Sequence, residues 1–91
     1  MTIKEAAREY RLPVETTPEL LEERWRNPIR FDNKVLLGVH YWTGTTGGRY
    51  FGAVYEFTTD ETTCEDPIRL TKVSEEGFSD EGHAIRWGMD Q

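Results

Sequence analysis

The sequence predicts an α+β fold in which two short N-terminal helices pack on an antiparallel sheet of three to five strands. Apolar residues recur at helical spacing before residue 28, and strand-like runs separated by turn residues follow it. A small, partly closed barrel capped by the helices is the alternative arrangement. The chain has 91 residues, so we expect a single domain over 1–91, helical over 1–27 and an antiparallel sheet over 28–91.

The first helix is predicted over residues 3–11. Thr2 and Glu5 have the spacing of a capping box, in which each side chain accepts a hydrogen bond from the other's backbone N–H. The apolar residues that follow share one helical face: Ile3, Ala6, Ala7 and Tyr10. Pro13 ends the helix, because the residue before a proline is driven out of helical geometry.

A second helix is predicted over residues 18–26. Thr17 can cap it, and Pro18 then occupies the first helical position, where a missing N–H has no cost. Leu21 and Trp25 lie one turn apart on it, and Pro28 follows its end.

The strongest strand signal is a hairpin, in which the runs VLLGVHYW and RYFGAVYEF flank a glycine-rich turn from Thr43 to Gly48. A register in which paired residue numbers sum to 92 gives one continuous apolar face. Its pairs are Val35 with Phe57, Leu37 with Tyr55, Val39 with Ala53, and Tyr41 with Phe51. On the reverse face this register sets Trp42 opposite Tyr50 and His40 opposite Gly52.

Shorter elements complete the predicted sheet. Residues 29–31 read as a short strand before the hairpin, and residues 68–73 read as another strand after it. Acidic loops at 60–66 and 74–82 flank that second strand, and a short last element is predicted at 83–87.

The formal charge of −6 is unevenly distributed along the chain. Residues 1–34 hold seven basic and seven acidic side chains, whereas residues 35–91 hold four basic and ten acidic ones. A negative domain is repelled by phosphate backbones and attracted to basic surfaces. The balance therefore disfavours direct nucleic-acid binding and favours a protein partner with a basic surface.

Neither a catalytic centre, a metal site nor a cofactor is predicted. The sequence has no GxSxG, P-loop or GxGxxG motif, and His40, Cys64 and His83 lack the spacing of structural zinc ligands. The opening residues MTIKEAAREY lack the apolar run of a signal peptide, and no long apolar run predicts a membrane span. With Cys64 as the only cysteine, we expect a cytoplasmic protein without a disulfide framework.

Two kinds of surface are candidate partner-binding sites. Trp42, Tyr50 and His40 would form an aromatic shelf on the reverse face of the hairpin, unless helices or the last element bury that face. The acidic loops would steer a basic partner if they share one edge of the sheet, or would only maintain solubility. Their candidate residues are Asp60, Glu61, Glu65, Asp66, Glu75 and Glu76.

The opening TIKEAAREYRL, with its Thr-x-x-Glu-Ala-Ala start, resembles the first helix of excisionase-type and mercury-regulator-type helix-turn-helix proteins. The resemblance covers residues 2–12 and implies a small DNA-binding regulator that uses the N-terminal helices. After residue 12, acidic residues occupy the stretch where a recognition helix would contact DNA phosphates. The DNA-binding function of those families is therefore not assigned to this chain. These acids are Glu15, Glu19, Glu22 and Glu23.

These observations favour a non-enzymatic protein-binding inhibitor or regulator. Its sharper form is a phage or mobile-element anti-defence protein, similar to anti-CRISPR proteins, that blocks a basic nucleic-acid-binding surface. The alternatives are an immunity protein or antitoxin that neutralises a basic toxin, and the DNA-binding regulator named above. The sequence leaves the oligomeric state open: an exposed strand edge beside Trp42 could pair with a second copy to form a homodimer, because unpaired edges invite association.

Overall fold

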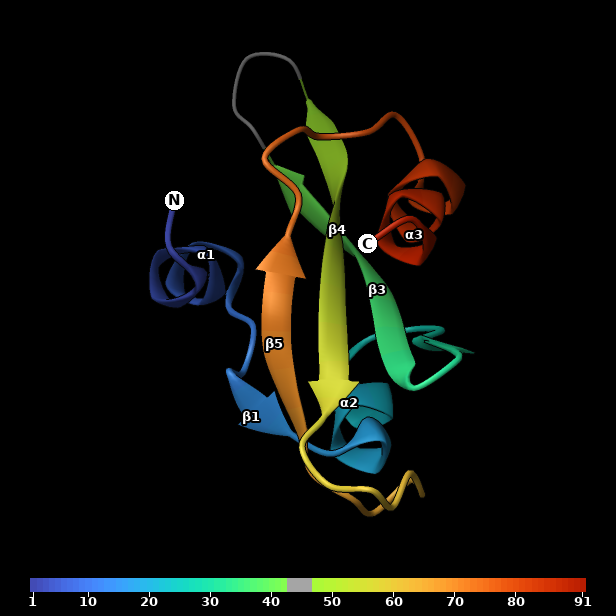
Figure 1. Ribbon diagram of the computed structural model, residues 1–91. Helices are drawn as coiled ribbons and strands as arrows, with labels where there is room; N and C mark the ends of the chain where they lie inside the picture. Colours follow the sequence, from blue (N-terminus) through green and yellow to red (C-terminus); the bar gives the residue numbers. More distant parts are fainter. Residues whose placement is uncertain (43–46) are drawn as a thin grey trace.

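A computed structural model describes residues 1–42 and 47–91. In this part of the chain, three helices pack on a five-stranded antiparallel sheet that does not close (Figure 1). The α+β prediction is confirmed, and the barrel alternative is wrong because the sheet remains open. Along the sheet the strands are β1 (Glu15–Thr16), β5 (Ile68–Val73), β4 (Gly48–Phe57), β3 (Lys34–Trp42) and β2 (Ile29–Phe31).

Both N-terminal helices form as predicted, as α1 (Ile3–Tyr10) and α2 (Pro18–Arg24). The Thr2–Glu5 capping box is complete, because each side chain accepts from the backbone N–H of the other residue. The Thr17 hydroxyl accepts from the backbone N–H of Leu20 at 3.2 Å and caps α2. The region 1–27, predicted to be helical, also contains the short strand β1, which lies between the two helices and pairs with β5.

The larger core lies between the sheet and the first two helices. Its buried residues are Ala7, Leu12, Leu21, Val35, Leu37, Val39, Ala53, Tyr55, Ile68 and Leu70. The predicted apolar face of the hairpin therefore faces α1 and α2. Tyr55 is fully buried there and donates a hydrogen bond to the Pro13 carbonyl at 2.7 Å, which ties β4 to the chain after α1.

The predicted hairpin register is wrong by two residues. Paired residue numbers sum to 90, so that Val35 lies opposite Tyr55 and Gly38 opposite Gly52. A shift of two residues leaves every side chain on its predicted face, and hydrophobic matching therefore cannot distinguish the two registers. The predicted turn falls partly on residues 43–46, which lie outside the described residues; Gly47 has a φ of 81° and Gly48 begins β4.

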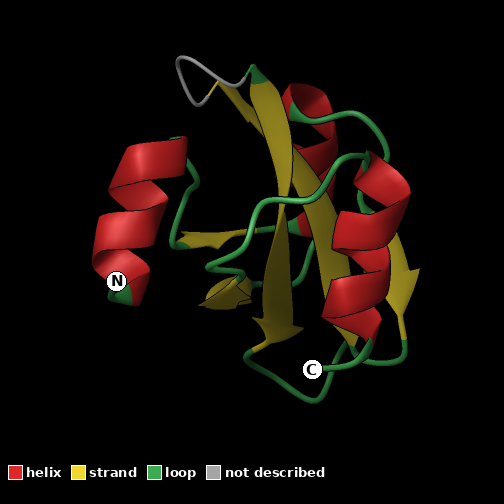
Figure 2. Cartoon of the chain, turned by 90° about the horizontal axis from the view of Figure 1, so that it is seen from above, coloured by secondary structure: helices red, strands yellow, loops and turns green. Residues whose placement is uncertain are grey.

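The last predicted element, assigned to the sheet region, is instead the helix α3 (Glu81–Met89). Asp80 caps it by accepting from the backbone N–H of His83 at 2.8 Å. Figure 2 shows α1 and α3 on opposite sides of the sheet. A smaller core forms on the α3 side, where Ile85 packs with Leu36 and Val54.

The pair Gly38 and Gly52 explains both the register and the position of α3. A Cβ at Gly52 would lie 2.8 Å from the Ala84 carbonyl oxygen and 2.4 Å from the Trp87 ring. A Cβ at Gly38 would lie 2.7 Å from the Glu81 side chain. Because two glycines face each other, the backbone of α3 can approach the sheet closely.

Candidate protein-interaction surface

The predicted aromatic residues lie where β3 and β4 extend past α3. The His40 and Tyr50 rings are cross-strand neighbours, with centroids 4.8 Å apart and planes tilted by 34°. Trp42 lies opposite Gly48, not Tyr50 as predicted, and 69% of its surface is exposed. The absence of a Cβ at Gly48 makes room for the His40 ring, since that atom would lie 2.1 Å from its Nε2.

The reverse face of the hairpin is thus divided into two parts. Its lower part is covered by α3 and buries Leu36 and Val54. Its upper part keeps His40 and Trp42 exposed and Tyr50 half-buried. The alternative in which this face is core holds for its lower part, and the upper part is left exposed or half-buried.

Two shallow clefts meet at His40. The first, of about 270 Å³, is lined by Trp25, Arg26, Gly38, His40, Tyr50 and Glu81. The second, of about 360 Å³, is lined by Glu9, Tyr10, Arg11, His40, Tyr41 and Trp42. Sequence reasoning missed the residues from outside the hairpin, because α1, α2 and α3 approach β3 only in the folded chain.

The second cleft is held together by a contact between Tyr41 and Glu9. The Tyr41 hydroxyl donates to the Glu9 carboxylate, and this hydrogen bond raises the pKa of Tyr41. Tyr10 packs edge-on against Tyr41 at a centroid distance of 4.8 Å. The end of α1 is therefore fixed against β3 beside the exposed Trp42.

The two predicted acidic groups lie at opposite ends of the sheet, as Figure 1 shows. Asp60, Glu61, Glu65 and Asp66 connect β4 to β5, whereas Glu75 and Glu76 follow the other end of β5. The condition for additive steering, a shared edge, is not met. Only the second group lies at the Trp42 end, where Phe78 exchanges two backbone hydrogen bonds with Tyr50, at 2.7 and 2.9 Å.

The carboxylates of these two acidic groups are not neutralised by the ion pairs of the described residues. Within the described ranges, the ion pairs are Arg69–Glu15 and His83–Asp80. Asp66 accepts a hydrogen bond from the Thr63 backbone N–H at 2.7 Å and Asp80 caps α3, while the other carboxylates of the two loops take part in neither ion pair. Exposed charges of this kind raise the rate of association with a basic partner more than its affinity.

Residues 12–91 match the family described as nucleotide modification associated domain 4. This chain belongs to that family. The matched region contains the whole sheet together with α2 and α3, and α1 precedes it. No curated protein and no solved structure matches the chain.

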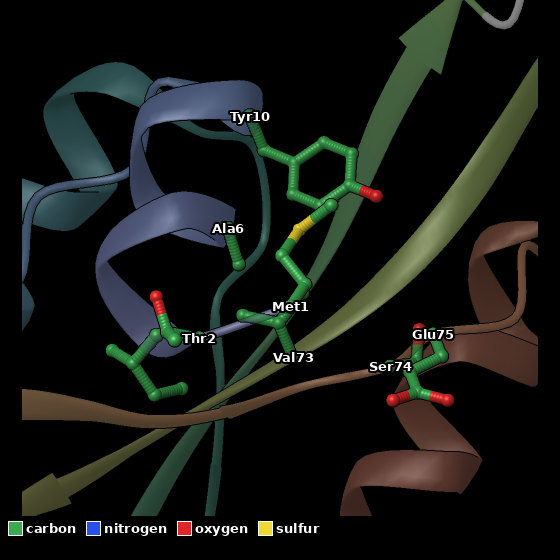
Figure 3. Close-up of a pocket in the computed structure, with 8 residues that line it drawn as sticks. Met1, Thr2, Ala6, Tyr10, Val73, Ser74 and Glu75 are labelled. Atoms are coloured by element: carbon green, nitrogen blue, oxygen red, sulfur yellow. The ribbon is translucent and has the colours of Figure 1, made fainter.

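The family-matched sheet also borders an apolar pocket, of about 170 Å³, between α1 and the end of β5. Figure 3 shows Ala6, Tyr10 and Thr2 beside α1, Ser74 and Glu75 on the opposite side, and Met1 and Val73 next to each other between them. The Ser74 hydroxyl is already engaged, because it accepts from the Gly52 N–H and donates to the Glu76 carbonyl, both at 2.9 Å. The pocket residues include neither His nor Cys.

Groups of metal ligands and membrane-spanning helices are both absent from residues 1–42 and 47–91. Among residues 1–42 and 47–91, no three His, Cys, Asp or Glu side chains are grouped so that they could hold a metal ion. In the same part of the chain, every helix is too short or too polar to cross a membrane.

Proposed function

We propose that this domain is a non-enzymatic, cytoplasmic protein-binding module that regulates or inhibits a protein of a nucleotide-modification system. The observation that carries the proposal is Trp42, which is 69% exposed beside the His40–Tyr50 pair. Exposed aromatic side chains bury a large area at small entropic cost and dominate the energy of protein interfaces. The association with nucleotide modification comes from the family description.

The charge of the chain supports a basic partner surface. Its formal charge of −6 attracts the kind of surface with which a DNA-modifying or RNA-modifying protein holds its substrate. Glu75 and Glu76 lie at the same end of the sheet as Trp42 and would meet the rim of such a surface. In this proposal the domain covers the partner's nucleic-acid site and competes with the substrate.

The other functional hypotheses remain predictions. An anti-defence inhibitor of the anti-CRISPR kind and an immunity protein would each use the same surface against a different target. The DNA-binding alternative has less support, because β1 separates α1 from α2 and the exposed positions of α2 include Glu19, Glu22 and Glu23.

The expected result is that Trp42→Ala weakens binding to the native partner by about 30-fold, equivalent to about 2 kcal/mol for an interface anchor. The partner is captured from the native host with the unmodified domain and identified by mass spectrometry, and its affinity is measured by calorimetry. Leu20→Ala is the matched control, since Leu20 is 54% exposed on α2, away from this surface.

Competition with nucleic acid tests the regulatory part of the proposal. The unmodified domain should displace a labelled oligonucleotide from the captured partner, and its affinity for that partner should fall as salt is raised. Equal affinities of the unmodified domain and Trp42→Ala would overturn the surface assignment. A partner that holds the oligonucleotide and the domain together would overturn the competition.

A further inference from the structure

We propose that β2 is a self-association edge, through which a second copy of this chain extends the sheet in an antiparallel manner. This inference is separate from the proposed function. The strand β2 pairs with the start of β3, at the other end of that strand from Trp42, and the association requires no other protein. The strand β2 ends the sheet, and all three of its residues are exposed. An unpaired strand edge is a template for pairing with another strand.

The exposed side chains of this edge form an apolar patch on the α3 side of the sheet. Ile29 lies opposite the buried Leu36, so both point toward α3, and Phe31 points the same way two residues later. Leu36 in turn contacts Gly88, the neighbour of Met89 in α3. Ile29, Phe31 and Met89, which we call the β2 patch, are 38%, 41% and 38% exposed.

A hydrogen bond between β3 and the residues after α3 holds the neighbourhood of the β2 patch in place. The Lys34 ammonium group donates to the Gln91 carbonyl at 2.5 Å, which fixes the residues after α3 against the hairpin formed by β2 and β3. Phe31 pairs with Lys34 across that hairpin. The patch is therefore held in place before association, which lowers the entropic cost of binding.

The single charged residue of β2 is turned away from the edge. Proteins commonly protect an edge strand with a charged side chain that opposes pairing. Here the Arg30 guanidinium lies 4.8 Å from the centroid of the Phe57 ring on β4, two strands further into the sheet. The Arg30 side chain therefore lies over the face of the sheet opposite to the β2 patch. No charged side chain of β2 is left at the edge to oppose pairing.

The edge is also self-complementary. If two β2 strands pair antiparallel about Arg30, Ile29 of each copy faces Phe31 of the other, which gives two apolar cross-strand pairs. The strand β2 and the turn after it, residues 29–33, carry one basic and one acidic side chain, Arg30 and Asp32, and so sum to zero, whereas the whole chain carries −6. The two Arg30 residues face each other in this pairing, but each guanidinium lies over the Phe57 ring of its own copy, which keeps the two charges away from the pairing edge.

The opposite edge of the sheet lacks these properties. The strand β1 has two polar residues, Glu15 and Thr16, and the Glu15 carboxylate pairs with Arg69. The edge beside Trp42, a candidate homodimer contact from the sequence, is the part of β3 that extends past β2, and Arg26 and Glu81 line the cleft there. The apolar and locally neutral edge is β2.

Sedimentation equilibrium of the purified chain tests the proposal. The apparent mass should rise from 10.6 kDa toward twice that value with increasing concentration. Phe31→Glu should weaken the dimer by at least about tenfold, because it places a charge in the apolar contact. Leu20→Glu, an exposed apolar position on α2, should leave the dimer unchanged, and circular dichroism checks that both variants fold.

Cysteine cross-linking tests the register. With Cys64 replaced by Ser, Arg30→Cys should form a disulfide-linked dimer under mild oxidation, because facing residues of paired strands lie within disulfide range. Leu20→Cys should remain uncross-linked in the same background. A chain that stays monomeric at every concentration, a Phe31→Glu dimer of unchanged affinity, or cross-linking through Trp42→Cys in place of Arg30→Cys would overturn the proposal.

The two proposals fail separately. Trp42→Ala should leave the mass distribution of the purified chain unchanged, while Phe31→Glu should keep its affinity for the captured partner in a monomeric form. Loss of the dimer in Trp42→Ala would move self-association to the hairpin end and overturn the assignment to β2.

Discussion

Replacing Tyr55 by alanine is expected to lower the free energy of unfolding by about 3–5 kcal/mol, the cost of removing a large buried aromatic side chain. Tyr55 is fully buried in the larger core and connects β4 to the Pro13 carbonyl. Since small domains have a net stability of about 5–15 kcal/mol, the variant should be largely unfolded in mild urea. Urea titration followed by circular dichroism measures the change.

Tyr55→Phe separates the hydroxyl from the ring. It should cost about 1–3 kcal/mol, because the Pro13 carbonyl loses its donor while the ring remains in place. Tyr41→Phe is the matched control, as its hydroxyl bonds to Glu9 at the surface and should matter much less. Equal stabilities of Tyr55→Phe and the unmodified chain would contradict the importance of the Pro13 contact.

Ionisation of Tyr55 should make the stability of the fold depend on pH in the alkaline range. Burial raises the pKa of Tyr55, whereas the unfolded chain ionises at the ordinary pKa of about 10. Stability from this group is therefore complete below about pH 10 and falls above it, by up to about 1.4 kcal/mol per pH unit. Tyr55→Phe should reduce this slope but retain part of it, because burial also raises the pKa of Tyr10.

Replacing Gly52 by valine is expected to displace α3 and lower the free energy of unfolding by about 3 kcal/mol, the upper end for overpacking a core. The new Cβ would lie 2.4 Å from the Trp87 ring and 2.8 Å from the Ala84 carbonyl, which is backbone and cannot move alone. Near-ultraviolet circular dichroism, to which the Trp87 ring contributes, would report the displacement of α3, and a urea titration would report the loss of stability.

Gly82→Ala is the control for that substitution. A Cβ at Gly82 would meet only the Asp80 carboxylate, at 3.3 Å, and alanine favours the helical conformation. The helical preference of alanine is worth up to about 1 kcal/mol, and the Asp80 Oδ1 that caps α3 must shift by a few tenths of an ångström, so this variant should lie within about 1 kcal/mol of the unmodified chain. A Gly52→Val chain with the stability of Gly82→Ala would mean that α3 does not require the close approach.

Local sequence signals predicted much of the fold. Caps and proline positions located α1 and α2, and alternation along residues 35–57 identified the face of the hairpin that becomes core. The register escaped prediction because the two candidates differ by two residues and bury the same side chains. The contact of α3 with Gly38 and Gly52 fits the observed register, and that contact joins residues far apart in the sequence.

The helix α3 itself carried a signal that could have been read. Asp80 stands where a cap belongs, and Ala84, Trp87 and Gly88 follow at helical spacing. The candidate surface was predicted in part: His40 and Tyr50 do meet, but Trp25 and Arg26 join them from the connection after α2, and Glu81 joins them from the start of α3. Their convergence depends on how the helices close around the sheet, which no local pattern encodes.

The unequal size of the two cores has a consequence for the dynamics of the domain. Among the described residues, the hydrophobic cluster on the α1 side contains ten buried residues, whereas the cluster on the α3 side contains three. Segments with less buried apolar contact open at lower free energy than the rest of a protein. Backbone amides of α3 should therefore exchange with deuterium through a partial opening in which the strands stay paired, so that the helix and the sheet behave as two cooperative units.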